Sequence, residues 1–217
     1  MRYGTVLFDL DGTLLDTIDD LGAAVNHALA LRGLPLHTRE EYKMMVGTGI
    51  RNLNRLSLPE NLSGDDALLD ACLKDFLEYY TSHIDVHTRP YPGMPELLKE
   101  LSDKGVKLAV TSNKFQAGTE HLMREFFPGI GFVAILGNRP GAPLKPDPAI
   151  VREVLSLSGS PKDKAVLVGD SATDIATAAN GGIASIGVGW GFRPLSELSG
   201  AGAIALTPAD LRALLLD

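Results

Sequence analysis

The sequence lacks several features that mark particular classes of protein. It contains a single cysteine, Cys72, which excludes a disulfide framework and any zinc or iron–sulfur site built from several cysteines. No apolar run approaches the roughly 18 residues that a membrane-spanning helix needs. Positive charge is scarce: 20 Lys and Arg stand against 27 Asp and Glu. The resulting net charge of −7 argues against nucleic acid as a main partner, because phosphate backbones demand concentrated positive charge.

The remaining composition is that of an ordinary globular chain. Its 217 residues are 45% hydrophobic and 22% charged, enough for one domain carrying a sizeable insertion. Only a short apolar run separates Arg2 from Asp9, so the N-terminus does not resemble a signal peptide. We therefore expect a cytoplasmic protein, away from membranes, that is a monomer or a homodimer.

Short apolar runs alternate with longer segments of helical periodicity. Runs of four to six residues without strict alternation are typical of strands covered on both faces. They lie at Tyr3–Phe8, Val106–Val110, Phe132–Leu136, Ala165–Val168, Ala184–Val188 and Ala203–Leu206. The helical segments between them are Pro95–Lys104, Gln116–Phe126, Ala149–Leu157, Ala172–Asn180 and Asp210–Leu216. This alternation predicts an α/β fold with a Rossmann-like parallel sheet.

One interval, from about Ile18 to Ser82, carries only helix signals. These lie at Leu21–Leu31, Glu40–Met45 and Ala67–Tyr80. The interval is too long for a simple crossover. It is either a long crossover with extra helices packed on the sheet or an inserted helical subdomain. We favour the subdomain, with residues 16–83 as a helical cap and residues 1–15 and 84–217 as the α/β core. The Pro- and Gly-containing tract Thr88–Gly93 would be the returning hinge.

The most informative segment follows the first predicted strand and reads Asp9–Leu10–Asp11–Gly12–Thr13–Leu14. Side chains alternate along a strand, so Asp9 and Asp11 project to one side. Gly12 permits a sharp turn. Two adjacent carboxylates repel each other unless a cation joins them or one is protonated. A capping pair at a strand end is the structural alternative.

Three further segments carry polar groups after predicted strands. Asp170 follows Ala165–Val168, and Asp174 lies four residues on, so both can face one way if a helix begins there. Ser112 and Asn113 offer a hydroxyl and backbone N–H groups at an expected helix N-terminus. Lys145 lies in a proline-stiffened loop that we expect to face solvent. Taken singly, each has a structural alternative, namely a helix cap for the polar groups and a surface lysine for Lys145.

Taken together, these groups indicate a site. Ligands of open α/β sheets bind beyond the carboxyl ends of the strands, which is where every one of these residues falls. Three carboxylates, one lysine and a hydroxyl that converge there can hold Mg²⁺ and a phosphate, since Mg²⁺ prefers oxygen ligands.

The four segments resemble the motifs of the haloacid dehalogenase superfamily, in order and spacing over nearly the whole chain. The helical block resembles the cap of the phosphoglycolate phosphatase-like branch. The resemblance implies that Asp9 is the nucleophile and Asp11 the general acid and base. It also implies that Lys145, Ser112 and N–H groups near Asn113 bind the phosphoryl group. Mg²⁺ would be held by Asp9, the Asp11 carbonyl and Asp170, with Asp174 supporting these ligands.

The resemblance implies a Mg²⁺-dependent phosphatase acting on a small phosphorylated metabolite, with 2-phosphoglycolate as the leading candidate. The segment Gly47–Arg51 is either a loop that dips over the substrate, with Arg51 binding its carboxylate, or a simple turn between helices. Pyrophosphatase, sugar-phosphate phosphatase and β-phosphoglucomutase-like activities remain alternatives. Mutases of this kind usually carry an acidic residue in place of Gly169. A phospho-receiver domain is an alternative from another class, against which the helical insertion counts.

Overall fold

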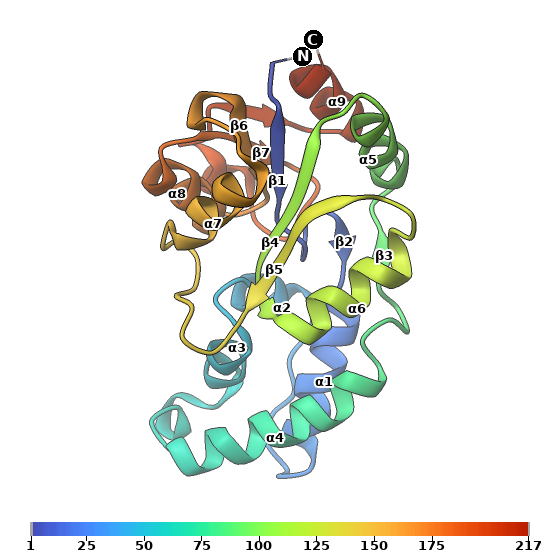
Figure 1. The fold of residues 1–217 in the computed structure, drawn as a ribbon. Coiled ribbons are helices and arrows are strands. Elements are labelled where there is room, and N and C mark those ends of the chain that lie inside the picture. Colours follow the sequence, from blue (N-terminus) through green and yellow to red (C-terminus); the bar gives the residue numbers. More distant parts are fainter. Residues whose placement is uncertain (1, 217) are drawn as a thin grey trace.

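The apolar runs of the sequence form one parallel sheet at the centre of the molecule (Figure 1). The structure is a computed structural model that describes residues 2–216. From edge to edge the strands are β5 (Phe132–Asn138), β4 (Lys107–Phe115), β1 (Thr5–Phe8), β6 (Ala165–Gly169), β7 (Ala184–Val188) and β8 (Ala203–Ala205). Every neighbouring pair is parallel. The predicted α/β fold is therefore confirmed.

Helices cover both faces of this sheet. One face carries α5 (Met94–Asp103), α6 (Gln116–Phe126) and α9 (Pro208–Leu216), and the other carries α7 (Ala149–Ser158) and α8 (Ala172–Gly181). Along β1, Val6 and Phe8 pack on the first side and Leu7 on the second. Both faces of the strand are thus buried, which is why its sequence is continuously apolar rather than alternating.

Four helices lie together at one end of the sheet (Figure 1). They are α1 (Ile18–Ala30), α2 (Arg39–Met45), α3 (Ile50–Ser57) and α4 (Asp66–Ser82), hereafter the helical segment. The helical periodicity of the sequence did not predict α3, because only two turns form and half of its residues are Arg or Asn. Single-turn 3₁₀ helices occur at Glu60–Leu62, Lys162–Lys164 and Leu195–Leu198. None of the helices in residues 2–216 has the length and apolar character needed to cross a membrane.

The helical segment is joined to the sheet by two short antiparallel strands, β2 (Leu15–Asp16) and β3 (Arg89–Pro90). Beside them, the buried Asp20 carboxylate accepts hydrogen bonds from the backbone N–H of His87, at 3.0 Å, and from that of Thr88, at 2.8 Å. The Thr88 hydroxyl donates to the same carboxylate at 2.8 Å. Charge-assisted bonds of this kind are stronger than neutral ones. The outgoing and returning chains are therefore fastened to each other.

Strand β4 extends further than the sequence predicts. The apolar run ends at Val110, but the extended backbone continues through Phe115, and α6 begins only at Gln116. The pairing of β4 with β5 is irregular between Thr111 and Phe115. Ser112 and Asn113 therefore lie on the end of a strand, and the expectation that they form a helix N-terminus is wrong.

Candidate active site

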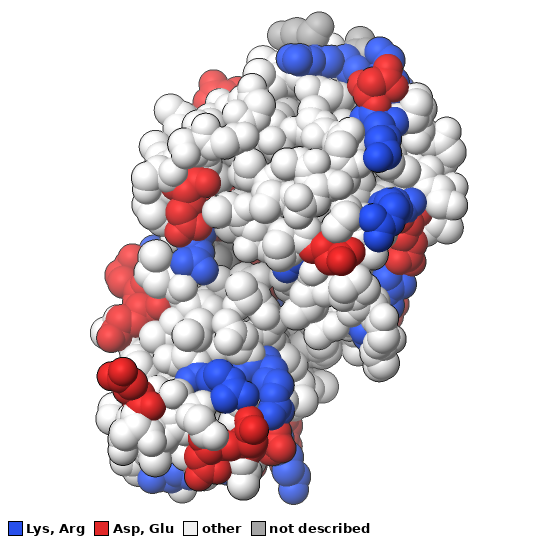
Figure 2. All heavy atoms as spheres, turned by 90° about the vertical axis from the view of Figure 1, so that its left-hand side faces the viewer, with Lys and Arg blue, Asp and Glu red and all other residues white. Residues whose placement is uncertain are grey.

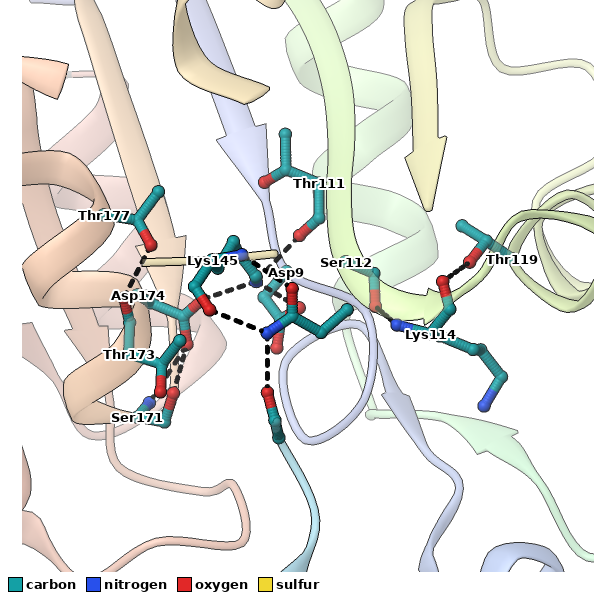
Figure 3. Close-up of polar contacts among 12 residues, drawn as sticks. Asp9, Thr111, Ser112, Lys114, Thr119, Lys145, Ser171, Thr173, Asp174 and Thr177 are labelled. Atoms are coloured by element: carbon teal, nitrogen blue, oxygen red, sulfur yellow. Dashed lines mark hydrogen bonds and ion pairs between the residues drawn. The ribbon is translucent and has the colours of Figure 1, made fainter. Parts of the chain in front are cut away.

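The Lys145 side chain connects three elements at the floor of the site (Figure 3). Its Nζ donates to Asp9 Oδ1 at 2.8 Å, to Asp174 Oδ1 at 2.7 Å and to the Thr111 carbonyl oxygen at 2.9 Å. The side chain is only 2% exposed, so the expectation of a solvent-facing loop is wrong. The cause is Asn113, whose side-chain amide binds both the backbone N–H and the carbonyl of Lys145 and draws the loop onto β4.

Three buried carboxylates surround this ammonium group. Asp9, Asp170 and Asp174 each offer an oxygen, and these three oxygens lie within 4.8 Å of one another. Burial raises the pKa of Asp9, an effect that Lys145 opposes and that the charges of Asp174 and Asp170 reinforce. Burial and the charge of Asp174 raise the pKa of Asp170 to about 7, although the Phe192 N–H lowers it. A donor set of carboxylate oxygens with excess negative charge fits a hard divalent cation such as Mg²⁺.

Two glycines make room for the Asp170 carboxyl group. A Cβ atom at either Gly12 or Gly191 would overlap the Asp170 side chain. Gly12 also has a φ of +87°, which an L-residue with a Cβ rarely adopts. The Phe192 N–H, next in the chain after Gly191, donates to Asp170 Oδ2 at 2.7 Å. The Gly-rich loop after β7 is therefore part of the wall around Asp170.

Asp11 lies at the edge of this cluster and has partners of its own. Its Oδ1 accepts hydrogen bonds from the Thr17 hydroxyl at 2.6 Å and from Lys114 Nζ at 3.0 Å. Lys114 also donates to the Tyr80 hydroxyl of α4 at 2.7 Å. The Lys114 side chain is 1% exposed, and the charge of Asp11 helps to raise its pKa against the effect of burial. Lys114 thus connects the Asp11 carboxylate to Tyr80 of the helical segment.

A residue pattern that would have revealed Lys114 was present in the sequence. Ser112 and Lys114 are two residues apart, and two-residue spacing places side chains on one side of an extended strand. This spacing places both side chains on one side only if the segment is a strand, whereas we expected a helix N-terminus there. Ser112 Oγ accepts a hydrogen bond from the Lys114 backbone N–H at 3.1 Å. Ser112 itself remains at the cavity wall, as its place in the sequence led us to expect.

Asp174 and Ser171 together form the start of α8. Ser171 donates from its backbone N–H, at 3.2 Å, and from its hydroxyl, at 2.7 Å, to Asp174 Oδ2. This reciprocal capping box is the structural alternative raised by the sequence, and it coexists with the bond of Asp174 Oδ1 to Lys145. Gly169 completes the arrangement, because a Cβ atom there would overlap the Asp174 side chain.

A cavity that is partly open to solvent lies between the sheet and the helical segment, with about 600 Å³ of empty space when the open part is included. The surface is hollowed where these two parts meet (Figure 2). From the sheet side the cavity is lined by Asp9, Asp11, Ser112, Asn113, Lys114, Lys145, Asp170, Ser171, Thr173, Phe192 and Arg193. From the helical segment it is lined by Leu21, Val46, Gly47, Gly49, Ile50 and Leu53. The structure thus brings all the sheet-side residues predicted from the sequence, except Asp174, to one cavity wall, and Asp174 lies directly behind it.

Arg51 is the predicted site residue that the structure does not bring to this cavity. Its side chain is 48% exposed and pairs with Asp70 and, at 3.5 Å, with Asp66. It therefore faces α4 rather than the cavity, and the carboxylate-binding role expected for it has no support in this arrangement. The cavity contains a different arginine, Arg193, which sequence reasoning missed. Arg193 follows the carboxyl end of β7, and the rule that located Asp170 and Ser112 could have located it too.

The chain is similar to several known proteins over most of its length. The family model described as "Haloacid dehalogenase-like hydrolase" matches residues 6–188. A phosphoglycolate phosphatase of Mesorhizobium japonicum is 38% identical over 193 residues, which are 88% of this chain and 85% of that protein. A phosphoglycolate phosphatase of Pseudomonas syringae pv. syringae is 37% identical over 216 residues, which are 97% of this chain and 78% of the relative.

Solved structures are also similar. One is a crystal structure of a protein provisionally named phosphoglycolate phosphatase from Lactobacillus delbrueckii subsp. bulgaricus. It is 35% identical, has a TM-score of 0.92, and the match covers 100% of this chain and 99% of that one. A variant of CbbY from Rhodobacter sphaeroides in complex with xylulose-1,5-bisphosphate is 25% identical with a TM-score of 0.79, over 96% of each chain.

Proposed function

The chain belongs to the haloacid dehalogenase-like hydrolase family and is a phosphatase, and from this premise we propose that it hydrolyses 2-phosphoglycolate with Mg²⁺ through an aspartyl-phosphate. The observation that carries the proposal is the contact of the buried Asp9 carboxylate with the buried Lys145 ammonium at the floor of the cavity. The names of the relatives support the choice of substrate.

In the first step Asp9 attacks phosphorus. Lys145 binds Asp9 Oδ1 and so fixes the carboxylate, while Oδ2 forms the new P–O bond and the bond to the leaving alkoxide breaks. Lys145 and Ser112, with backbone N–H groups near Asn113, neutralise the phosphoryl oxygens as charge develops on them. Water then attacks the phosphorus of the aspartyl-phosphate, which releases phosphate and regenerates the Asp9 carboxylate.

The oxygen cluster is the proposed metal site. Asp9, the main-chain carbonyl of Asp11 and Asp170 would hold Mg²⁺, which when bound polarises the phosphoryl group as a Lewis acid. Asp174 would support this set by binding Lys145 through Oδ1 and Ser171 through Oδ2. Lys145 alone leaves the three carboxylates with excess negative charge, which the cation would neutralise before a phosphate dianion enters.

Asp11 is the proposed general acid and base. It would donate a proton to the leaving alkoxide and then accept one from the attacking water. Thr17 and Lys114 both bind Asp11 Oδ1. These bonds orient the carboxyl group and leave Oδ2 free to donate and accept the proton. Lys114 acts through Asp11 and is a positioning residue.

Replacing Asp11 with Asn should reduce kcat by about 10²- to 10⁴-fold, the range typical of general acid–base groups. The amide retains an oxygen for Thr17 and Lys114 but cannot transfer the proton. Both half-reactions should slow, measured as phosphorylation of the protein and as its dephosphorylation in single-turnover experiments. A variant with more than half of the wild-type kcat would show that Asp11 is not the acid and base.

We also propose that residues 16–83 act as a cap over a core made of residues 1–15 and 84–217. The paired strands β2 and β3 and the Asp20–Thr88 bonds support a compact two-stranded hinge at this boundary. Two donors from the sheet side, Asn113 Nδ2 and Arg193 Nη2, bind the carbonyls of Gly47 and Val46 in the helical segment, at 2.9 and 2.7 Å. Closure of such a cap excludes water and strengthens the charge interactions inside the site.

The proposed function is tested by hydrolysis of 2-phosphoglycolate and by its dependence on metal. EDTA should abolish turnover and Mg²⁺ should restore it, whereas Ca²⁺ should inhibit because it imposes looser coordination. Mg²⁺ should also raise Tm, since a ligand at a hundredfold excess over its Kd stabilises the folded state by about 2.7 kcal/mol. Full turnover after exhaustive chelation would refute the metal role of Asp9 and Asp170.

A sugar phosphate is the second candidate substrate, because CbbY is similar in fold and was crystallised with a sugar bisphosphate. A screen of phosphorylated metabolites that includes pyrophosphate separates these possibilities by kcat/KM. A mutase-type acidic residue at position 169 has no space here, because Asp174 fills it. The phospho-receiver alternative is wrong, since the family match covers residues 6–188.

A further inference from the structure

Arg193 has an unusual position among the cations of the cavity. It lies in the loop after β7, one residue beyond the Phe192 N–H that binds Asp170, so its backbone is anchored beside the carboxylate cluster. Its side chain is 15% exposed. Nη2 donates to the Val46 carbonyl at 2.7 Å, at the point where the helical segment meets the sheet. The guanidinium group is thus fixed at the cavity wall and still accessible from it.

The other two cations of the cavity form hydrogen bonds with carboxylates of the site. Lys145 binds two carboxylates, at 2.8 and 2.7 Å, and Lys114 binds Asp11 at 3.0 Å. The carboxylate partner of Arg193 is Glu197, whose Oε1 lies 3.7 Å from Nη1, beyond hydrogen-bond distance. Among the described residues that line the cavity, Arg193 is therefore the cation whose ion pair with a carboxylate is longer than a hydrogen bond. This leaves N–H groups of its guanidinium free to bind a second anionic group of the ligand.

The helical side of the cavity offers no alternative. Its lining residues are apolar or glycine. Gly47 and Gly49 have no side chains, so the backbone itself forms the wall there. The arginine of this loop, Arg51, is turned away toward Asp70. Among residues 2–216, the cations that line the cavity and could bind a second negative charge of the substrate all come from the sheet side.

We infer that Arg193 is the specificity residue that binds a carboxylate at the end of the substrate opposite the phosphate. A planar guanidinium group matches a carboxylate in a bidentate geometry that a lysine cannot reproduce. This inference rests on the proposed function and narrows it: the substrate class is short phosphate monoesters with a carboxylate, selected by the core rather than by the helical segment.

The test compares 2-phosphoglycolate with ethyl phosphate, which has nearly the same size but no carboxylate. Arg193→Gln keeps a donor for the Val46 carbonyl and removes the charge. In this variant kcat/KM for 2-phosphoglycolate should fall about 10- to 100-fold through KM, the range of a charge-assisted hydrogen bond, and that for ethyl phosphate by less than about threefold. Arg193→Lys should recover only part of the loss. Arg51→Gln, the matched arginine control, should not change the ratio of the two substrates.

A second measurement separates this inference from the choice of physiological substrate. Phosphonoacetate and ethylphosphonate are compared as competitive inhibitors of p-nitrophenyl phosphate hydrolysis. Phosphonoacetate should bind wild type more tightly, and Arg193→Gln should remove that preference. If the preference disappears in this way while wild type fails to hydrolyse 2-phosphoglycolate, the proposed substrate is wrong and the role of Arg193 stands. Equal losses on both substrates, no loss on either, or a selective loss in Arg51→Gln instead would overturn the inference.

Discussion

Replacing Asp9 with Asn should abolish hydrolysis while leaving the protein at least as resistant to heat as the wild type. Removing a nucleophile from a catalytic unit costs on the order of 10⁶-fold in kcat in well-studied hydrolases, so residual activity below about 10⁻⁴ of wild type is expected. The amide oxygen can still accept the bond from Lys145. Burial raises the pKa of Asp9, Lys145 opposes this effect and the charges of Asp174 and Asp170 reinforce it, so on balance the ionised form is disfavoured in the folded protein. Removing that charge therefore relieves repulsion.

The measurements are kcat with p-nitrophenyl phosphate and Tm without added metal. Asp103→Asn is a suitable control, because Asp103 is 63% exposed and its ion pair within residues 2–216 is with Lys99 on the surface. The control should retain wild-type kcat. A turnover above about 1% of wild type in Asp9→Asn, or a marked fall in its Tm, would contradict the assignment of Asp9 as a nucleophile held in a repulsive cluster.

Replacing Lys145 with Met should abolish activity and also destabilise the fold. Lys145 makes three buried hydrogen bonds, and its loss leaves Asp9 and Asp174 without their cation. Breaking a buried ion pair from one side costs about 3–5 kcal/mol of unfolding free energy. A lysine in a solvent-facing loop, which the sequence led us to expect, would not have this effect on stability. Urea denaturation measures the loss.

A double variant shows whether the destabilisation arises from the buried carboxylates of Asp9 and Asp174 that have lost their cation. Adding Asp174→Asn to Lys145→Met should restore part of the unfolding free energy, because the two changes act on one contact and are not additive, while activity stays absent. Lys99→Met is the matched control, since its surface ion pair contributes about 1 kcal/mol or less. A Lys145→Met protein as stable as Lys99→Met would contradict the proposal that Lys145 stabilises the fold by pairing with the buried carboxylates.

Most strands and the motif residues could be predicted because their signals are local. Four to six apolar residues followed by Asp9 or Asp170 mark a buried strand and its carboxyl end without reference to distant segments. The predictions that were wrong concern side chains whose positions depend on contacts between distant segments. The burial of Lys145 depends on Asn113, 32 residues away, and the orientation of Arg51 depends on Asp70 on another helix. Neither partner can be identified from spacing along the chain.

The side chain of Asp174 fills the space that a side chain at position 169 would need, and this limits which substitutions the two positions can accept. With Asp174 in place, any side chain at position 169 would overlap it, so a carboxylate can be supplied from one position or the other but not from both. A single substitution of Gly169 by an acidic residue must therefore displace the group that orients Lys145. A viable exchange would need a second change at position 174 to a small residue, made together with the first. The two positions should vary as a pair, and each intermediate on the path between the two arrangements should be less fit than either end.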